Sequence, residues 1–267
     1  MITFNRNPAF AGKKILITRP EEKSSTLAEK LKALGARPIV FPLTRIVSSK
    51  TFRSIDESLK KWNEFDIVVF TSALAVKFYL ERAQTLKIRL LNPKILYAIG
   101  PQTAKALKAA GFGKIRMARE FRAEGLLEEL RNVRGLKILI PRAAAAREIL
   151  PRTLRKRGAT VRVPTVYQVL PNKKSLEKIQ RMSKNDFDAV IFTSGRSVKE
   201  FVKAFGLMKS RKLFSEVPGV CIGGVTAEVM AAYGINGVKS QSPDEGGLIK
   251  ALKKVLRKGD TGENFKK

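Results

Sequence analysis

Histidine is absent from this 267-residue sequence, and cysteine occurs only once, as Cys221. Without histidine, the chain lacks the commonest general base and the commonest metal ligand of proteins. A single cysteine cannot form a disulfide within the chain, and Cys221 lies in an apolar run where we expect a small buried thiol. Any catalytic site in this protein must therefore use other residue types.

Long apolar runs are also missing. No stretch approaches the roughly 18 consecutive apolar residues that a membrane-spanning helix needs. The N-terminal sequence MITFNRNPAFAGKK has no apolar segment of the length found in secretory signals. We therefore expect a soluble, cytoplasmic protein.

Acidic residues are few, with 23 Asp and Glu against 53 Lys and Arg, a formal net charge of +30. Such an excess predicts attraction to an anion, which could be nucleic acid, a membrane surface or a polyanionic small molecule. Lysine-rich helix surfaces that serve solubility explain the excess equally well. No basic motif interleaved with aromatic residues is present, so base stacking is not indicated.

Several familiar site motifs are missing. Asp66 and Asp188 precede the predicted strands rather than follow them, which excludes a phosphoacceptor domain. The GFG sequence at 111–113 follows a helix and lacks the third glycine of a dinucleotide-binding loop, and there is no Walker-type loop. The SG dipeptide at 194–195 is not flanked as a nucleophile elbow. The residues that remain at the predicted strand ends are rich in hydrogen-bond donors and poor in bases. They indicate either catalysis by conformational control with mild acid assistance or binding alone.

The sequence contains an internal repeat. DIVVFTSALAVKF begins at residue 66 and DAVIFTSGRSVKE at residue 188; KILITR begins at residue 14 and KILIPR at residue 137. IGPQTA at residue 99 likewise matches IGGVTA at residue 222. Because order and spacing hold over most of the chain, we infer a duplicated unit of about 123 residues and two domains of ordinary size.

Short apolar runs alternate with amphipathic stretches of helical length. This alternation is typical of βαβ units that form a parallel sheet covered on both faces. We expect the first helix to start at Pro20, to carry Glu21 and Glu22 in its first turn and to end at Gly35. Later helix ends are predicted at Gly111, Gly158 and Gly234.

Two stretches at equivalent points of the repeats break this pattern. Residues 37–42 and 161–167 are extended, β-branched or aromatic, and interrupted by prolines. Such segments suit an edge ribbon or a connector better than a central strand. We expect them to run side by side between the two lobes, and we expect the tail from Gly259 to be disordered.

The chemistry is predicted to lie at strand-to-helix turns, because open parallel sheets bind ligands outside the carboxyl ends of their strands. The candidate binding residues at these turns are Thr18, Arg19, Thr71, Ser72, Gly100, Thr103, Arg142, Ser194, Gly195, Gly223 and Thr226. Their hydroxyls, backbone donors and guanidinium groups suit carboxylates, and we expect the sets from the two repeats to face one cleft. Alternatively, Ser72 and Ser194 are plain N-caps, and Thr103 and Thr226 are ordinary first-turn residues.

The ordered set of motifs resembles the uroporphyrinogen-III synthase family. The set comprises ITRP after the first strand, FTS before a helix in each repeat, GATVRVPTVY at the second connector and IGGVTA near the end; the resemblance covers residues from about 13 to 255. It implies two flavodoxin-like α/β lobes from a tandem duplication, joined by a two-stranded β connector. The lobes would be residues 1–36 with 171–267, and residues 43–160, with inter-lobe connectors at 37–42 and 161–170.

The resemblance implies a cyclising hydro-lyase of haem, sirohaem or cobalamin biosynthesis. Hydroxymethylbilane, a linear tetrapyrrole with eight carboxylates, loses water and closes with inversion of ring D through a spiro intermediate, without cofactor or metal. Tyr167 maps onto the family tyrosine and would assist departure of the hydroxyl. Ser194 and Thr226 would bind acetate or propionate groups. A monomer and transient contact with the preceding pathway enzyme are also implied.

Two other functions fit the residues. A cleft between duplicated lobes suits a non-catalytic binding or regulatory protein for an anionic ligand, although no appended DNA-reading domain is present. A nucleic-acid-binding protein is supported by charge alone, and its binding would depend strongly on salt. Tyr167 itself also fits a purely structural role, as an aromatic residue packed at the connector.

Overall fold

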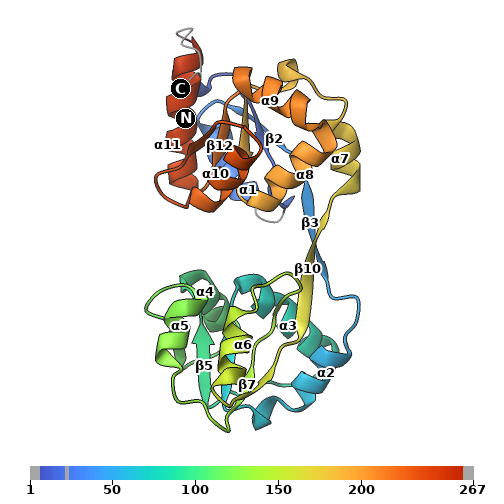
Figure 1. Ribbon diagram of the computed structural model, residues 1–267, viewed down its shortest axis with the longest axis vertical. Coiled ribbons are helices and arrows are strands. Elements are labelled where there is room, and N and C mark those ends of the chain that lie inside the picture. Colours follow the sequence, from blue (N-terminus) through green and yellow to red (C-terminus); the bar gives the residue numbers. More distant parts are fainter. Residues whose placement is uncertain (1–6, 22–23, 261–267) are drawn as a thin grey trace, which may run out of the picture. The chain divides into compact units, whose positions relative to one another are not determined.

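Two parallel five-stranded sheets organise the computed structural model, which describes residues 7–21 and 24–260 (Figure 1). The chain divides into two units: unit 1 comprises Met1–Arg45 and Leu170–Lys267, and unit 2 comprises Ile46–Val169. The mixed α/β class with parallel sheets confirms the predicted fold class. The tail expected to be disordered starts at Gly259, but Gly259 and Asp260 belong to the last helix, and residues 261–267 lie outside the described residues.

The sheet of unit 1 has the strand order β13-β12-β11-β1-β2. Its strands are β1 (Lys14–Ile17), β2 (Arg37–Val40), β11 (Ala189–Phe192), β12 (Gly219–Cys221) and β13 (Gly237–Lys239). β1 pairs in parallel with β11, so that Ile15 lies opposite Ala189. The first strand of the chain therefore joins a sheet whose centre comes from the C-terminal half.

The sheet of unit 2 has the equivalent order β6-β5-β4-β7-β9. Its strands are β4 (Ile67–Phe70), β5 (Ile95–Ala98), β6 (Ile115–Met117), β7 (Lys137–Leu139) and β9 (Thr160–Arg162). β4 pairs in parallel with β7, so that Ile67 lies opposite Ile138. Strands matched by the sequence repeat thus occupy matching places in the two sheets.

A third sheet has the order β3-β10-β8. Its strands are β3 (Thr44–Ser48), β8 (Arg142–Ala143) and β10 (Thr165–Pro171). The chain passes from unit 1 to unit 2 within β3 and returns within β10. Both crossings therefore lie in neighbouring strands of one sheet.

The prediction that residues 37–42 and 161–167 lie side by side is wrong. Arg37–Val40 forms the edge strand β2 beside β1, and Thr160–Arg162 forms the edge strand β9 beside β7. The edge position suits Pro38, which has no backbone N–H to offer a further strand. The strands that do pair are β3, which follows the first stretch, and β10, which begins at Thr165 within the second stretch.

Helices pack on both faces of each sheet (Figure 1). Those of unit 1 are α1 (Ser25–Ala33), α7 (Lys173–Ile179), α8 (Gly195–Phe205), α9 (Leu207–Glu216), α10 (Gly224–Ala232) and α11 (Glu245–Asp260). Those of unit 2 are α2 (Arg53–Lys60), α3 (Ala73–Thr85), α4 (Pro101–Ala109), α5 (Ala123–Glu129) and α6 (Ile149–Lys156). Short 3-10 helices are η1 (Pro8–Phe10), η3 (Trp62–Glu64) and η4 (Lys184–Asp186). No helix in the described ranges is long and apolar enough to cross a membrane.

The helix ends were predicted more accurately than the first helix start. Gly35, Gly111, Gly158 and Gly234 each follow a helix with φ of +96°, +88°, +84° and +69°, the left-handed region that glycine enters without strain. In contrast, α1 begins at Ser25 and not at Pro20. The Ser24 hydroxyl donates to the carbonyl oxygens of Arg19 and Pro20, at 3.2 and 3.0 Å, so local bonding holds that segment outside the helix.

Alternate residues of the central strands enter separate cores. On β11, Val190 and Phe192 join one apolar cluster, whereas Ala189 and Ile191 join the cluster on the opposite face. This is the period of two that a strand imposes, and burial on both faces explains the unbroken apolar runs. Cys221 is fully buried, as predicted, and burial raises the pKa of its thiol.

The repeat preserves an aromatic pair in each core. Phe70 and Tyr79 meet edge to face in unit 2 with ring centroids 5.8 Å apart. Phe192 and Phe201 meet the same way in unit 1 at 5.5 Å. The Tyr79 hydroxyl, which has no counterpart on Phe201, lies 3.0 Å from the Ser58 hydroxyl. The duplicated pattern therefore encodes the same packing twice with one added hydrogen bond.

The repeated aspartates fasten neighbouring strands. Asp66 Oδ2 accepts from the backbone N–H of Lys137 at 2.9 Å, and Oδ1 accepts from Lys94 Nζ at 2.7 Å. In unit 1, Asp188 Oδ2 accepts from the backbone N–H of Lys14 at 2.7 Å. Each aspartate thus binds the first residue of the strand beside its own, which gives the repeated DxV pattern a structural role.

We predict that Asp66→Asn lowers the free energy of unfolding by about 1 kcal/mol at pH 7. The hydrogen bonds from Lys94 and from the Lys137 N–H hold the pKa of Asp66 below its ordinary value. The stabilisation is therefore complete above the unfolded pKa and is lost as pH falls through the lower, folded one. Urea unfolding at pH 7 and pH 3 measures the difference from wild type, which we expect to shrink in acid.

The exposed residue Glu128 supplies the control in the same unit, because Glu128→Gln removes a carboxylate that no strand uses. We expect that variant to differ little from wild type at either pH. An Asp66→Asn difference of equal size at pH 7 and pH 3 would contradict the role assigned to the Asp66 charge.

Candidate active site

The structure brings Tyr167 and Ser72 together in unit 2. Ser72 ends the loop after β4 and caps α3, its Oγ accepting from the Ala75 N–H at 3.1 Å. Tyr167 lies on β10, and its hydroxyl is 3.3 Å from Ser72 Oγ. The Tyr167 ring stacks on Phe78 of α3 with centroids 5.6 Å apart and an interplanar angle of 20°. The ring is therefore fixed by packing, and its polar end is held at the start of a helix.

Gly100 and Thr103 occupy the next strand-to-helix turn of unit 2. Gly100 is the N-cap of α4, with Pro101 as the first helical residue. Thr103 is buried in the first turn, with 5% of its surface exposed. Their position at the carboxyl end of β5 is the one predicted from the sequence. Because Thr103 is buried, the first turn of α4 offers a ligand its backbone N–H groups rather than the Thr103 hydroxyl.

Arg142 is the buried charge of this region, with 8% of its surface exposed. Its Nη1 donates to the carbonyl oxygen of Arg147 at 2.8 Å, and its Nη2 donates to the Glu148 carboxylate. Burial lowers the pKa of the Arg142 guanidinium from its ordinary value, and the positive charge of Arg155 lowers it further. Arg142 is thus a cation held with little water around it.

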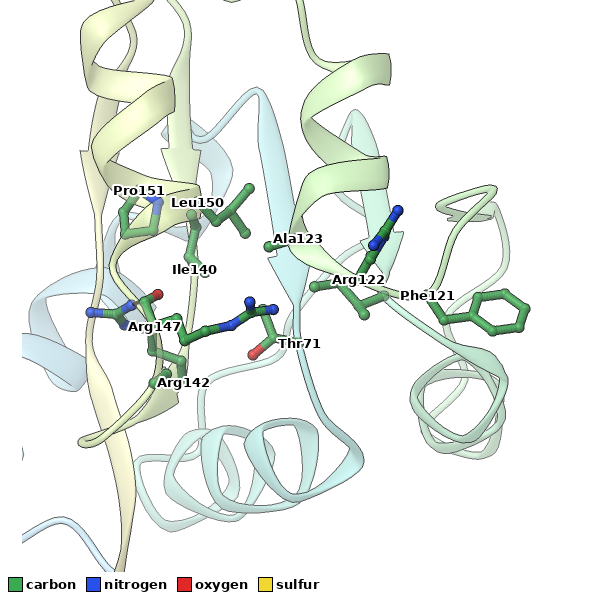
Figure 2. A pocket seen from close by; sticks show the side chains of 11 residues that line it. Thr71, Phe121, Arg122, Ala123, Ile140, Arg142, Arg147, Leu150 and Pro151 are labelled. Carbon is green, nitrogen blue, oxygen red and sulfur yellow. Dashed lines mark hydrogen bonds between the residues drawn. The ribbon is translucent and has the colours of Figure 1, made fainter. Parts of the chain in front are cut away.

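A pocket of about 220 Å³ opens beside Arg142 (Figure 2). It is lined by Thr71, Ile99, Phe121, Arg122, Ala123, Ile140, Arg142, Ala146, Arg147, Leu150 and Pro151. Two of these residues, Thr71 and Arg142, were predicted as binding residues from the sequence. Arg122, Arg147 and Phe121 were missed, although the spacing of two arginines in PRAAAARE after a buried strand offered a signal.

In unit 1, the residues of the first turn are engaged within the protein. Thr18 is fully buried, and its Oγ1 donates to the carbonyl oxygen of Ile191 at 2.7 Å. Arg19 Nη2 pairs with the Glu245 carboxylate at 2.6 Å, and Lys30 pairs with the same carboxylate at 2.9 Å. Thr18 therefore holds β1 to β11, and the Arg19 guanidinium already has an internal carboxylate.

The other predicted residues of unit 1 lie at two helix starts. Ser194 caps α8 by accepting from the Ser197 N–H at 3.2 Å, as Ser72 caps α3. A Cβ on Gly195 would lie 2.8 Å from Val229 Cγ2 of α10, so this glycine permits the close approach of the two helices. Gly223 is the N-cap of α10, and Thr226 is buried in its first turn. The N-cap geometry proposed for both serines is therefore present.

Hydroxyls and guanidinium groups dominate these turns. Within residues 7–21 and 24–260, no group of three or more Cys, Asp or Glu side chains is placed to hold a metal ion. A phenol beside a serine hydroxyl can donate a hydrogen bond, and the arginines can bind carboxylates. The arrangement can thus bind a polycarboxylate and assist a leaving hydroxyl.

The family model described as "Uroporphyrinogen-III synthase HemD" matches residues 25–250, most of the chain. The chain belongs to the uroporphyrinogen-III synthase family. The uroporphyrinogen-III synthase of Salmonella typhimurium is 32% identical over 190 residues, covering 69% of this chain and 77% of that protein. The uroporphyrinogen-III synthase of Synechococcus elongatus is 28% identical over 218 residues, covering 80% and 83%.

Solved structures of uroporphyrinogen-III synthases share the fold. A mutant of the Thermus thermophilus enzyme has a TM-score of 0.66 at 21% identity, covering 92% of this chain and 100% of that one. The Helicobacter pylori enzyme has a TM-score of 0.61 at 21% identity, covering 91% and 99%. The family expectation drawn from the sequence motifs is confirmed.

Proposed function

We propose that this protein is a uroporphyrinogen-III synthase that converts hydroxymethylbilane to uroporphyrinogen III with inversion of ring D. The family match over residues 25–250 supports the reaction class. The single structural observation that carries the chemistry is the Tyr167 hydroxyl 3.3 Å from Ser72 Oγ at the carboxyl end of β4. The protein acts on a small-molecule polycarboxylate, and we place its reaction in the cytoplasm, after the enzyme that makes the bilane.

The reaction needs departure of a hydroxyl and control of geometry. The C–O bond of the hydroxymethyl group breaks, and the oxygen leaves as water after gaining a proton. A C–C bond then forms at ring D, fragmentation of the spiro intermediate inverts that ring, and a proton is lost on closure. Tyr167 donates a hydrogen bond to the departing oxygen, with Ser72 orienting the phenol. Spontaneous closure gives the uninverted isomer, so holding the chain in the correct fold decides the product.

The binding of eight carboxylates is assigned to the strand-to-helix turns. In unit 2, Thr71, Ser72, Gly100 and Arg142 offer hydroxyl, backbone and guanidinium donors to acetate and propionate groups. In unit 1, the starts of α8 at Ser194 and of α10 at Gly223 offer free backbone N–H groups beside a serine hydroxyl. Arg19 joins this set by exchanging Glu245 for a substrate carboxylate. Thr18, Thr103, Gly195 and Thr226 support the set by shaping the strand and helix starts.

Isomer analysis tests this proposal. Freshly generated hydroxymethylbilane is supplied with and without the protein, the products are oxidised, and the type III and type I porphyrins are separated. We expect isomer III to predominate only when the protein is present. Isomer I alone, from protein with native circular dichroism, would overturn the proposal and favour the non-catalytic binding protein.

A further inference from the structure

The pocket in unit 2 carries three positive charges in its lining and no carboxylate. Arg122, Arg142 and Arg147 line it, Thr71 adds a hydroxyl, and the remaining lining side chains are apolar. In Figure 2, Arg142 and Arg147 lie on one side and Arg122 and Phe121 on the other, with Thr71 between them. We name this site the arginine pocket, and its lining favours an anion.

The carboxylates that balance these arginines lie outside the lining. Those of Glu120 and Glu148 are open to solvent, whereas Glu124 is partly buried. Glu120 pairs with Arg122 at 2.6 Å and Glu124 with Arg147 at 3.1 Å. Arg142 pairs with Glu148, whose side chain is 63% exposed while that of Arg142 is 10% exposed. An exposed carboxylate returns to water at little cost, whereas the buried guanidinium needs a partner. Glu148 can therefore be exchanged for the carboxylate of a ligand.

An exposed aromatic side chain lies at the rim of the arginine pocket. Phe121 is 60% exposed although it is a large apolar residue; it lies across the pocket from Arg142 and Arg147, with its ring turned outward from them (Figure 2). Leu150 and Pro151 add apolar surface beside the arginines. A flat ring that carries a carboxylate would meet apolar atoms with its face and cations with its side chain.

The size of the arginine pocket sets how much of a ligand it holds. Its volume of about 220 Å³ is less than the roughly 300–1,000 Å³ of sites that enclose a whole drug-sized molecule. A tetrapyrrole is larger still, so the pocket takes one carboxylate arm and part of one ring.

We propose that the arginine pocket binds one carboxylate side chain of the tetrapyrrole substrate. Arg142 and Arg147 hold the carboxylate from one side and Arg122 from the other. The exposed ring of Phe121 turns inward to contact the pyrrole that bears the carboxylate, and Glu148 is displaced. This inference rests on the proposed function, and it adds Arg122, Arg147, Phe121 and Glu148 to the residues that select the substrate.

Binding of uroporphyrin III, a stable octacarboxylate, tests the arginine pocket without turnover. Arg147 is 70% exposed, so Arg147→Gln removes the charge without opening the core. We expect its Kd, measured by fluorescence quenching, to rise about tenfold, as loss of one charge-assisted hydrogen bond implies. Glu148→Gln should lower the Kd, because it frees Arg142 for the ligand.

Arg89→Gln is the matched control, because Arg89 is an exposed arginine of unit 2 outside the pocket lining. At equal ionic strength we expect Arg89→Gln to bind uroporphyrin III as wild type does. An Arg147→Gln protein that binds no worse than Arg89→Gln would overturn the inference. Arg122→Gln, on the opposite side of the pocket, repeats the comparison with a second exposed arginine.

Substrate analogues show whether a single carboxylate is the partner. Each analogue of hydroxymethylbilane has one carboxylate replaced by a methyl group, and KM is measured with wild type and with Arg147→Gln. We expect one analogue to raise KM about tenfold with wild type and to cause no further rise with Arg147→Gln. Losses that multiply for every analogue would contradict the inference. If the wild-type protein binds uroporphyrin III but forms no isomer III, the proposed function is wrong. The Kd values for uroporphyrin III would still show whether the arginine pocket binds a carboxylate.

Discussion

Tyr167→Phe is expected to lower kcat for isomer III formation about 100-fold while leaving the fold intact. General acid assistance to a leaving group contributes on the order of 10²- to 10⁴-fold, and a phenol that mainly donates a hydrogen bond belongs at the lower end. Phenylalanine keeps the stack on Phe78 at 5.6 Å and loses only the hydroxyl that lies 3.3 Å from Ser72 Oγ. Initial rates with fresh hydroxymethylbilane, corrected for spontaneous closure, give kcat, and circular dichroism checks the fold.

The kinetic pattern distinguishes catalysis from binding. If Tyr167 acts only when the hydroxyl departs, kcat and kcat/KM should fall by the same factor in Tyr167→Phe. A rise in KM with kcat unchanged would instead make the Tyr167 hydroxyl a substrate ligand. Near wild-type kcat would remove Tyr167 from the chemistry.

Tyr79→Phe is the matched control for the loss of a buried hydroxyl in unit 2. Tyr79 is fully buried, and its hydroxyl contacts Ser58 at 3.0 Å rather than a strand-to-helix turn. The equivalent position in unit 1 is Phe201, so the core geometry already accepts phenylalanine there. We expect Tyr79→Phe to retain wild-type kcat and to lose about 1 kcal/mol of stability. Equal activity losses in the two variants would point to a general effect on unit 2.

The central strands could be predicted because their sequence signal is local and occurs twice. β4 and β11 are buried on both faces, so all four residues of each are apolar and stand out between polar helices. The family was recognisable for a related reason. Its motifs follow strand ends, where the backbone geometry restricts the residue types that fit.

The pairing of β3 with β10 could not be derived in the same way. These strands are far apart in the chain, and nothing in their own residues selects one partner over another edge strand. The start of α1 was misplaced because Pro20 and two glutamates mimic a first turn, whereas the Ser24 side chain bonds the preceding carbonyl groups. Competition between local hydrogen bonds is hard to weigh from sequence alone.

In the candidate site, too, residues with a local sequence signal could be predicted and residues that converge from distant segments could not. Ser72 and Ser194 were placed correctly at helix starts, because an N-cap is a local pattern. The convergence of residues in the arginine pocket was missed because they come from the loops after β4, β5 and β7, from the segment before α5 and from the start of α6. Scattered arginines in a chain with a formal charge of +30 give no hint of which ones converge.

Phe201→Ala is expected to lower the free energy of unfolding of unit 1 by about 3–5 kcal/mol. Phe201 is fully buried, and its ring meets those of Phe192, Phe205 and Phe214 at centroid distances of 5.5, 5.3 and 5.4 Å. Truncation removes all these contacts and leaves a cavity that a helix packed on a sheet cannot readily close. Phe121→Ala is the control, since Phe121 is 60% exposed, and it should change stability by no more than about 0.5 kcal/mol.

Trp62, the one tryptophan of the sequence, allows the effect to be assigned to a unit. Trp62 lies in the core of unit 2 against Tyr79 and Phe112, and each apolar cluster draws its residues from a single unit. We therefore expect the urea transition followed by circular dichroism to broaden or divide in Phe201→Ala, while the transition followed by Trp62 fluorescence stays in place. A common shift of both signals would show that the units unfold together. A loss below about 1 kcal/mol would mean that the aromatic cluster re-forms around the missing ring.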